Sequence, residues 1–303
     1  MNRLSKLKGN AIFDAIFVNR KGLVGFSILL LFTLVAILGP RMSPYDPYQS
    51  FTPYQPPSLS HPLGTDYFGY DVLSWLIVGT RVSMLVGYLA GLGTTLLAVI
   101  MGVLGGYYDK TLFGELVNGI TNIFLVLPGL PLLIILAAEF KFSSVYAVAL
   151  GIIIISWSFS ARVLRSQVLT LKSRDYVIAD RTLGMSDFWI LVKDVLPQMI
   201  SIIFSTFLFS MIGAILTETT LDFIGLGDVN TVSWGAMLYW AEDELAYSNN
   251  IWWWFIPPGV AIGLVGAALV LINLALDEVT NTRLQAIKLM KKAESELERL
   301  IKR

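Results

Sequence analysis

The residues that could carry chemistry in this chain are acidic and basic side chains gathered between apolar stretches. The longest such polar stretch covers residues 160–198, and within it YVIADRTLGMSDFWILVKDVLP runs from Tyr176 to Pro197. The chain has no cysteine and one histidine, His61, and a single imidazole is a poor ligand set for a metal ion. The sequence also lacks a GxxxxGK[ST] phosphate loop and any Ser-His-Asp or metal-hydrolase arrangement. We therefore predict that the chain is not an enzyme and holds neither a metal nor a cofactor.

The polar stretch has the pattern of two helices joined at a glycine. In its first half, apolar residues recur on one helical face, which holds Tyr176, Ala179 and Leu183. The charged residues lie off that face and are Asp175, Asp180 and Arg181. Gly184 then permits a sharp turn. Ser186 can cap a second helix over residues 188–196, which we expect to stop at Pro197. An ordinary interhelical loop lying on a membrane is the alternative interpretation of this pattern.

The rest of the chain is dominated by apolar stretches of membrane-spanning length. Hydrophobic residues make up 55% of the chain and charged residues 15%, whereas an ordinary soluble protein is about one quarter charged. In the third stretch, Pro128 and Pro131 predict a kink or an unwound segment. We predict an all-α membrane protein with six spans, over residues 23–38, 82–104, 117–138, 145–159, 199–216 and 254–276.

The distribution of lysine and arginine predicts the orientation of these spans. All but three of the 22 basic residues fall in segments that share a side if the N-terminus is cytoplasmic; the exceptions are Arg41, Arg81 and Lys141. Both termini are therefore expected in the cytoplasm, and the first apolar stretch is expected to be retained as a span. We divide the chain into an N-terminal tail, first span and outer loop (1–81), a five-helix core (82–277) that carries the polar stretch 160–198, and a cytoplasmic amphipathic tail (278–303).

The predicted spans contain no Asp, Glu, Lys, Arg or His, and no internal repeat is evident. Ion-coupled carriers usually need ionisable groups at mid-membrane, and many are built from inverted repeats. The pattern therefore weighs against a secondary carrier or channel, and it indicates that the energy for any transport comes from another protein.

The stretch from Tyr176 to Pro197 resembles the EAA loop of ABC importer permeases. The spacing from Gly184 to the Leu-Pro ending matches that loop, although Ile178 replaces its usual Glu and Asp180 its second Ala. The resemblance implies that the first helix docks into a groove on an ATPase subunit; the missing Glu leaves Asp180 or Asp175 to supply an ion pair. The docking residues so implied are Tyr176, Val177, Ala179, Asp180, Arg181, Leu183 and Gly184.

Three further segments resemble the C-type permease subunit of dipeptide, oligopeptide and nickel importers. They are HPLGTD followed by GYDVL near residue 61, TETTLDFIGLG followed by SWGAML near residue 217, and WWW through PG and Asn273 to Arg283-Leu284. Tyr70 and Trp75 stand where that family usually has arginine, and Asn281-Thr282 replaces the usual Asp-Pro. The resemblance covers about residues 15–284, and it implies a type I importer fold.

The resemblance implies a permease subunit that moves di- or oligopeptides by alternating access. Its implied partners are a homologous B-type permease, two ATPase subunits that bind ATP and magnesium, and an extracellular substrate-binding protein. The implied location is a prokaryotic inner membrane, with the bilayer and no nucleic acid as surroundings. Oligosaccharides or nickel are alternative substrates. A secondary carrier or channel, and a scaffold protein without transport, are the rival classes.

The outer loops supply the remaining candidate residues. Glu218 and Asp222 lie just beyond the predicted fifth span and are candidates for an outer gate, whereas Asp228 and the acids at 242–244 fit a solvated surface. His61 is expected to order the first outer loop rather than to bind a metal. Trp252, Trp253 and Trp254 fit an aromatic belt at the membrane interface, with substrate stacking as the alternative.

Overall fold

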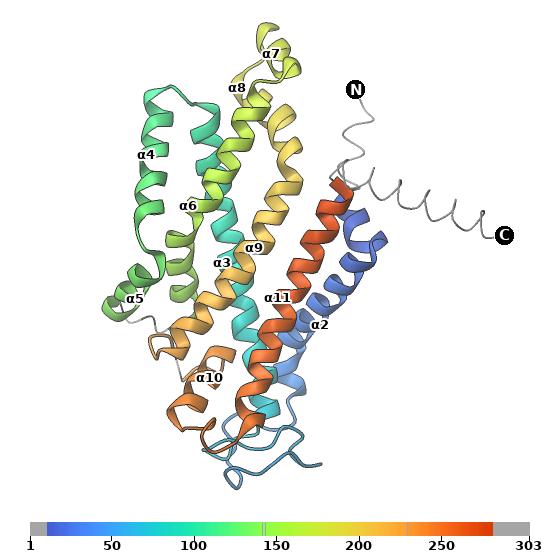
Figure 1. The fold of residues 1–303 in the computed structure, drawn as a ribbon, viewed down its shortest axis with the longest axis vertical. Coiled ribbons are helices and arrows are strands. Elements are labelled where there is room, and N and C mark those ends of the chain that lie inside the picture. Colours follow the sequence, from blue (N-terminus) through green and yellow to red (C-terminus); the bar gives the residue numbers. More distant parts are fainter. Residues whose placement is uncertain (1–10, 141, 143, 229, 281–303) are drawn as a thin grey trace, which may run out of the picture.

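The computed structural model describes residues 11–140, 142, 144–228 and 230–280, and this part of the chain is helical with no strand. Figure 1 shows a bundle of long helices. The short helix α7 (Asp175–Thr182) lies beyond one end, and α10 (Trp234–Asp243) lies with the first outer loop at the opposite end. The predicted all-α membrane fold is confirmed. The tail predicted over residues 278–303 lies largely outside the described residues.

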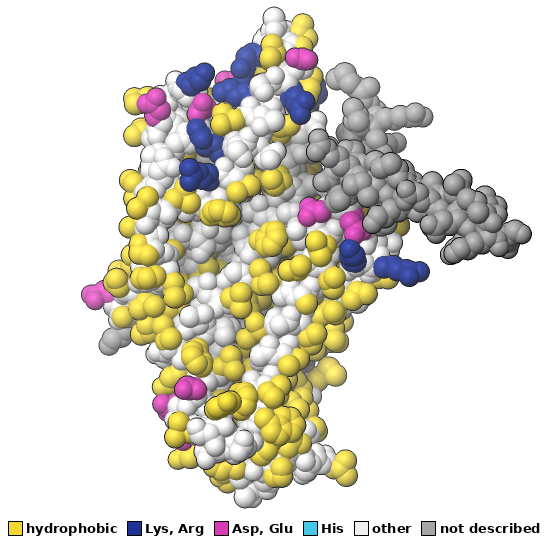
Figure 2. Space-filling model, viewed as in Figure 1, with side chains coloured by type: hydrophobic (Ala, Val, Ile, Leu, Met, Phe, Trp, Pro, Cys, Tyr) yellow, Lys and Arg dark blue, Asp and Glu magenta, His cyan; other side chains and the backbone are white. Residues whose placement is uncertain are grey.

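Five of the described helices are long and apolar enough to cross a bilayer, which takes about 20 residues. Along the face drawn in Figure 2, apolar side chains cover the length of the bundle, and basic side chains gather in the half that carries α7. A short π-helix, η1 (Asp14–Val18), precedes the first of these helices. The five are α2 (Arg20–Met42), α3 (Val72–Tyr107), α6 (Val145–Lys172), α9 (Leu196–Phe223) and α11 (Trp252–Thr280).

The sixth span is a broken helix. Helices α4 (Leu112–Val126) and α5 (Gly129–Phe140) meet at an angle of 85°. Leu127 is extended at the break, and it is followed by Pro128. Because Pro128 and Pro131 have no backbone N–H, a regular helix through this point would lack two hydrogen bonds. The predicted break in the third span is therefore confirmed, and counting this pair as one gives six spans.

Helix α3 is the centre of the bundle and packs against α2, α4, α6, α9 and α10. Its glycines make the approach close. A Cβ at Gly91 would lie 2.9 Å from the Cα of Met211 in α9, and a Cβ at Gly102 would lie 2.6 Å from the carbonyl oxygen of Ala161 in α6. These glycines thus form part of the surface that holds α6 and α9 against α3.

The predicted spans are shorter than the helices, and three boundaries differ most from the structure. Helix α3 begins at Val72 rather than at residue 82, because the Asp71 side chain caps it by accepting from Ser74 N–H. Helix α6 continues to Lys172, well into the stretch that was expected to be a loop. Helix α9 extends to Phe223 rather than ending at residue 216. Hydropathy marks only the part of a helix suited to lipid, and capping residues set where the helix itself ends.

The second helix of the predicted elbow also differs from expectation, because it does not stop at Pro197. Helix α8 (Asp187–Ile190) leads into a π-helix, η2 (Leu191–Val195), which joins α9 directly. Pro197 stands in the first turn of α9, where a missing backbone N–H costs little. The elbow is therefore continuous with the fifth span rather than separated from it by a break.

Candidate functional site

The elbow turns at Gly184, which adopts a left-handed conformation with φ of +81°. Gly184 N–H donates to the carbonyl oxygen of Arg181, and Met185 N–H donates to that of Asp180, both at 3.1 Å. These two bonds form a Schellman motif, which satisfies the last carbonyl groups of α7. On the far side, Ser186 caps α8 by accepting from Trp189 N–H. The predicted helix–glycine–helix elbow is present as expected.

Helix α7 buries one side chain, Val177, and leaves most of its other side chains open. Val177 is completely buried in a cluster with Val168, Ile190 and Val195. By contrast, Tyr176 is 41% exposed and Leu183 is 80% exposed. Of the residues grouped as a docking set from the sequence, Val177 therefore fastens α7 to the bundle instead of facing a partner. Ala179, Arg181 and Gly184 share the exposed surface with Tyr176 and Leu183, and Asp180 is partly exposed.

Two acids meet where α7 lies against the start of the fifth span. Asp180 lies within hydrogen-bonding reach of Asp194 in η2. The Oδ2 atom of Asp194 is buried and has no hydrogen-bond partner among the described residues. Asp175, the other acid considered for an ion pair, is exposed at the first turn of α7. The geometry therefore places Asp180, but not Asp175, in a shared acidic contact.

A polar contact that sequence reasoning missed ties the elbow to α3. The side chain of Tyr107, the last residue of α3, is buried, and its hydroxyl donates to Asp187 Oδ1 at 2.7 Å. Arg181 Nη2 donates to the same hydroxyl at 3.0 Å. A tyrosine at the end of an apolar span is ordinarily an interfacial residue, so the sequence carries no signal for this contact.

At the opposite end of the bundle, the candidate gate residues lie in a buried polar network. Glu218 is 2% exposed, and Ser83 Oγ in α3 donates to both of its carboxylate oxygens at 3.3 Å. Asp222 is also buried and accepts from Ser233 Oγ, the cap of α10. Trp234 N–H in turn donates to Ser83 Oγ at 3.2 Å. The network therefore joins α3, α9 and α10.

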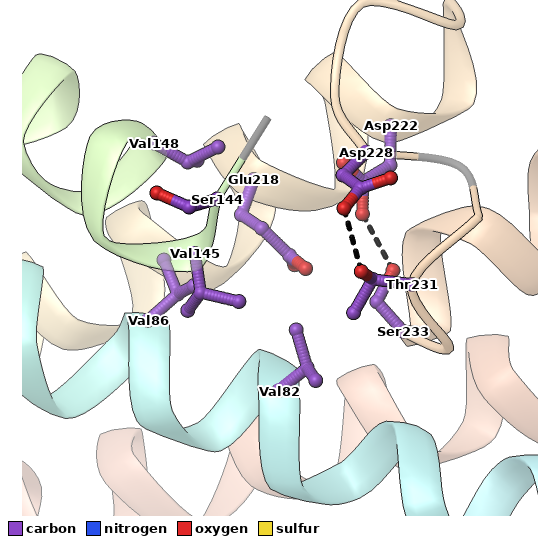
Figure 3. A pocket seen from close by; sticks show the side chains of 10 residues that line it. All are labelled: Val82, Val86, Ser144, Val145, Val148, Glu218, Asp222, Asp228, Thr231 and Ser233. Carbon is purple, nitrogen blue, oxygen red and sulfur yellow. Dashed lines mark hydrogen bonds between the residues drawn. The ribbon is translucent and has the colours of Figure 1, made fainter. Parts of the chain in front are cut away.

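Figure 3 shows the Glu218 carboxyl group pointing into a small cavity between α9, α3 and the start of α6. The cavity volume is about 20 Å³, which is room for roughly one water molecule. The prediction that Glu218 and Asp222 lie in a loop outside the span is wrong, because α9 extends past both residues. The residues that line the cavity are Val82, Val86, Ser144, Val145, Val148, Glu218, Asp222, Asp228, Thr231 and Ser233.

The first outer loop is fixed to α3 by its histidine. His61 is buried with its Nδ1 2.9 Å from Asp71 Oδ2, and its ring packs against Tyr45 and Phe51. Asp71 is the same residue whose other carboxylate oxygen caps α3 at Ser74. One acid thus holds both the loop and the helix start, and the role expected of His61 in ordering the loop is confirmed.

Comparison with known proteins decides the family. The model of binding-protein-dependent transport system inner membrane components matches residues 94–285, which is more than half of the chain. A second model, the N-terminal TM domain of oligopeptide transport permease C, matches residues 12–57. The chain belongs to this permease family. The resemblance drawn from the four sequence segments is therefore confirmed, and the protein is a multi-pass permease subunit of an ABC importer.

Curated relatives cover most of this permease. A putative peptide transport system permease protein of Brucella suis is 32% identical over 270 residues, covering 86% of this chain and 88% of its own. The dipeptide transport system permease protein DppC of Bacillus subtilis is 32% identical over 273 residues, covering 88% and 83%. The oligopeptide transport system permease protein OppC of the same organism is 33% identical over 246 residues, covering 80% and 79%.

The three tryptophans that begin the last span of the permease have separate roles. Trp254 is 1% exposed and packs in the outer core, and Trp253 Nε1 donates to the carbonyl oxygen of Thr65 in the first outer loop at 3.2 Å. Trp252 is half exposed. The predicted aromatic belt therefore fits Trp252 best, whereas the other two hold the outer loop against α11.

The stability of the permease's outer loop should depend on pH through Asp66. Burial raises the pKa of this carboxyl from 3.8 to about 7, and backbone hydrogen bonds from Tyr70 and nearby residues act in the opposite direction. The folded loop therefore favours the protonated form. Its stabilisation is fully present below about pH 4 and is lost as the pH rises through about 7. We expect hydrogen exchange at the Tyr70 amide, corrected for intrinsic rates, to be several-fold faster at pH 8 than at pH 5.

Asp66→Asn is the matched control for this pH dependence. It keeps an oxygen to accept from Tyr70 N–H, a bond of 2.7 Å in the wild type, but it cannot ionise. Exchange in this variant should be equally slow at both pH values. If the loop of Asp66→Asn still opens at pH 8, the pH dependence belongs to a group other than Asp66.

Proposed function

We propose that this permease forms one half of the pore of a peptide importer and that separate ATPase subunits drive it through the elbow. The observation that carries the proposal is the exposure of α7 beyond the bundle. The buried Val177 side chain attaches α7 to the bundle, whereas the side chains of Tyr176 and Leu183 are exposed and accessible to a partner. The second half of the pore is a homologous B-type permease, and an extracellular substrate-binding protein delivers the substrate.

The proposed cycle is alternating access. ATP and magnesium bind the partner ATPases, whose closure moves the elbow, and the spans then pivot between inward-open and outward-open forms. The direct attachment of α6 to α7 and of α8 to η2 and α9 supports this transmission. A cavity of about 330 Å³ beside the α4–α5 break, lined in part by Phe124, Ser158 and Thr217, supports a pathway along this face.

Di- and oligopeptides are the proposed substrates, because relatives covering four fifths or more of this chain are named as dipeptide or oligopeptide permeases. The test is uptake of a labelled dipeptide and a labelled pentapeptide into proteoliposomes that contain the complete importer and ATP. We expect uptake of the labelled peptides. Unlabelled peptides should inhibit this uptake by competition, and oligosaccharides should not. ATP-dependent uptake of a labelled oligosaccharide, or of nickel, with no peptide uptake would contradict the assignment.

A further inference from the structure

Tyr107 contacts both arms of the elbow through one oxygen atom. Its hydroxyl donates to Asp187, the first residue of α8, and accepts from Arg181, near the end of α7. These two partners lie on opposite sides of the turn at Gly184, and their own charged groups are 3.9 Å apart. A hydroxyl that uses its proton and a lone pair in this way ties both arms to the end of α3, whereas the turn between the arms is set by Gly184 and its backbone hydrogen bonds.

The ring and backbone of Tyr107 hold two cations as well. The Arg181 guanidinium lies 5.5 Å from the ring centroid, and the Lys172 ammonium lies 5.7 Å from it. Lys172 Nζ also donates to the carbonyl oxygen of Tyr107. Because Lys172 is the last residue of α6, the end of α6 meets α7 and α8 at this one residue of α3. Attraction of a cation to an aromatic face adds to the hydrogen bonds.

This cluster matters because α3 has no direct chain connection to the elbow. The polypeptide joins α7 to α6 on one side and, through α8 and η2, to α9 on the other. Movement of α7 therefore reaches α3 through non-covalent contacts rather than along the chain. The apolar contacts of Val177, Ile190 and Val195 near α3 are non-directional, whereas the bonds at the Tyr107 hydroxyl have a fixed direction.

A second ion pair near the end of α3 does not serve this purpose. Arg165 Nη2 donates to Asp109 Oδ1 at 2.7 Å. That contact links α6 to the turn after α3 and leaves both arms of the elbow untouched. Tyr107 thus carries the directional polar contacts between α3 and α7 among the described residues.

We infer that Tyr107 is the positioning residue that transmits movement of α7 into α3, the helix that also reaches the outer polar network through Ser83. The inference rests on the proposed function, in which α7 receives the ATPase. A residue in this role sets how much transport each hydrolysed ATP produces. It does not set how tightly the ATPase binds, because its side chain is buried away from the exposed docking surface.

The first experiment measures coupling in the complete importer, reconstituted with Tyr107→Phe or Tyr108→Phe. Tyr108→Phe is the matched control, since the Tyr108 hydroxyl has no hydrogen-bond partner within the described ranges. For Tyr107→Phe we expect wild-type ATPase co-purification, ATP hydrolysis within twofold of wild type, and at least a threefold fall in peptide transported per ATP. Tyr108→Phe should match the wild type. An unchanged ratio in Tyr107→Phe, or a loss of ATPase binding in proportion to transport, would overturn the inference.

A second measurement is independent of ATPase binding. The chain has no cysteine, so spin labels can be placed at Lys110→Cys, just after α3, and at Thr182→Cys, at the end of α7. Their distance distribution is measured in the permease without ATPases. Tyr107→Phe should broaden it, and an unchanged distribution would overturn the inference. If wild-type α7 fails to bind the ATPase at all, the proposed function fails, yet this distance still decides the role of Tyr107.

Substitution at Asp187 supplies the rescue test. Asp187→Asn keeps an oxygen that accepts from the Tyr107 hydroxyl, whereas Asp187→Ala removes it. We expect Asp187→Asn to retain more than half of the wild-type transport per ATP and Asp187→Ala to match Tyr107→Phe. The double variant Tyr107→Phe/Asp187→Ala should lose less than the sum of the two single losses, because both substitutions remove the Tyr107–Asp187 bond. Additive losses in the double variant would contradict a shared role.

Discussion

Replacing Gly184 with valine should reduce co-purification of the ATPase subunits at least tenfold. The residue has φ of +81°, and a side chain in the left-handed region costs about 1–2 kcal/mol. Valine adds to this cost because it is β-branched. A new Cβ at this position would meet no atom within 4 Å, so the effect comes from the backbone conformation rather than from a clash. Since about 1.4 kcal/mol corresponds to a factor of ten in an equilibrium constant, the ratio of the correctly turned elbow to its other conformations falls by about that factor or more.

A graded series at position 184 separates conformation from side-chain size. Gly184→Asn should retain most ATPase binding, because asparagine adopts left-handed geometry more readily than other residues with a side chain. Gly184→Ala should lie between asparagine and valine. The measurement is the yield of ATPase captured on immobilised, detergent-solubilised permease. Wild-type capture by Gly184→Val would show that the elbow is not the docking site.

Replacing Glu218 with alanine should abolish most peptide uptake and destabilise the outer end of the bundle. Its carboxyl group is buried against Ser83, and Ser83 also accepts from Trp234 N–H. Removing the acid leaves the buried Ser83 hydroxyl without its acceptor, which costs about 1–3 kcal/mol. The enlarged cavity adds a further cost, because the α3 and α9 backbones cannot close over it fully. We expect at least a fivefold loss of uptake together with a lower unfolding temperature.

Glu218→Gln is the conservative partner of this variant, because it keeps the side-chain length and an oxygen that accepts from Ser83. It should retain at least half of the wild-type uptake and nearly the wild-type unfolding temperature. Glu242→Ala, in the exposed part of α10, controls for the loss of an outer acid without burial. If Glu218→Ala transports as well as Glu242→Ala, the outer polar network is dispensable for the cycle.

The elbow could be predicted from the sequence because its determinants are local. A glycine at the turn, a serine three residues before the N–H that it caps, and an apolar stripe all act within a few residues of one another. The direction of that stripe could not be predicted. Val177 is the buried anchor, whereas the stripe of Tyr176, Ala179 and Leu183 faces outward. Whether an apolar face is covered by the same chain or awaits a partner depends on tertiary packing.

The contacts that join distant helices were beyond local reasoning. Tyr107 and Asp187 are 80 positions apart, and Ser83 and Glu218 are 135 positions apart. A single sequence does not indicate which distant residue a serine or tyrosine in an apolar span will contact. The gate acids were identified as candidates but placed outside the span, because hydropathy falls before the helix ends. The capping and turn residues that follow Phe223, not the end of the apolar stretch, set the true boundary.

Helix α6 is one unbroken helix that connects the two ends of the permease. It has 28 residues, or about 42 Å at 1.5 Å per residue. Its first residues line the cavity at Glu218, and its last residue holds Tyr107. The close approach of Ala161 to Gly102 lies nearer the Tyr107 end, at about 24 Å from one tip and about 17 Å from the other by the same rise. With that contact as the fulcrum, α6 is a lever whose longer arm ends at the Glu218 cavity, so a displacement at the Tyr107 end moves the opposite tip about 1.5 times as far.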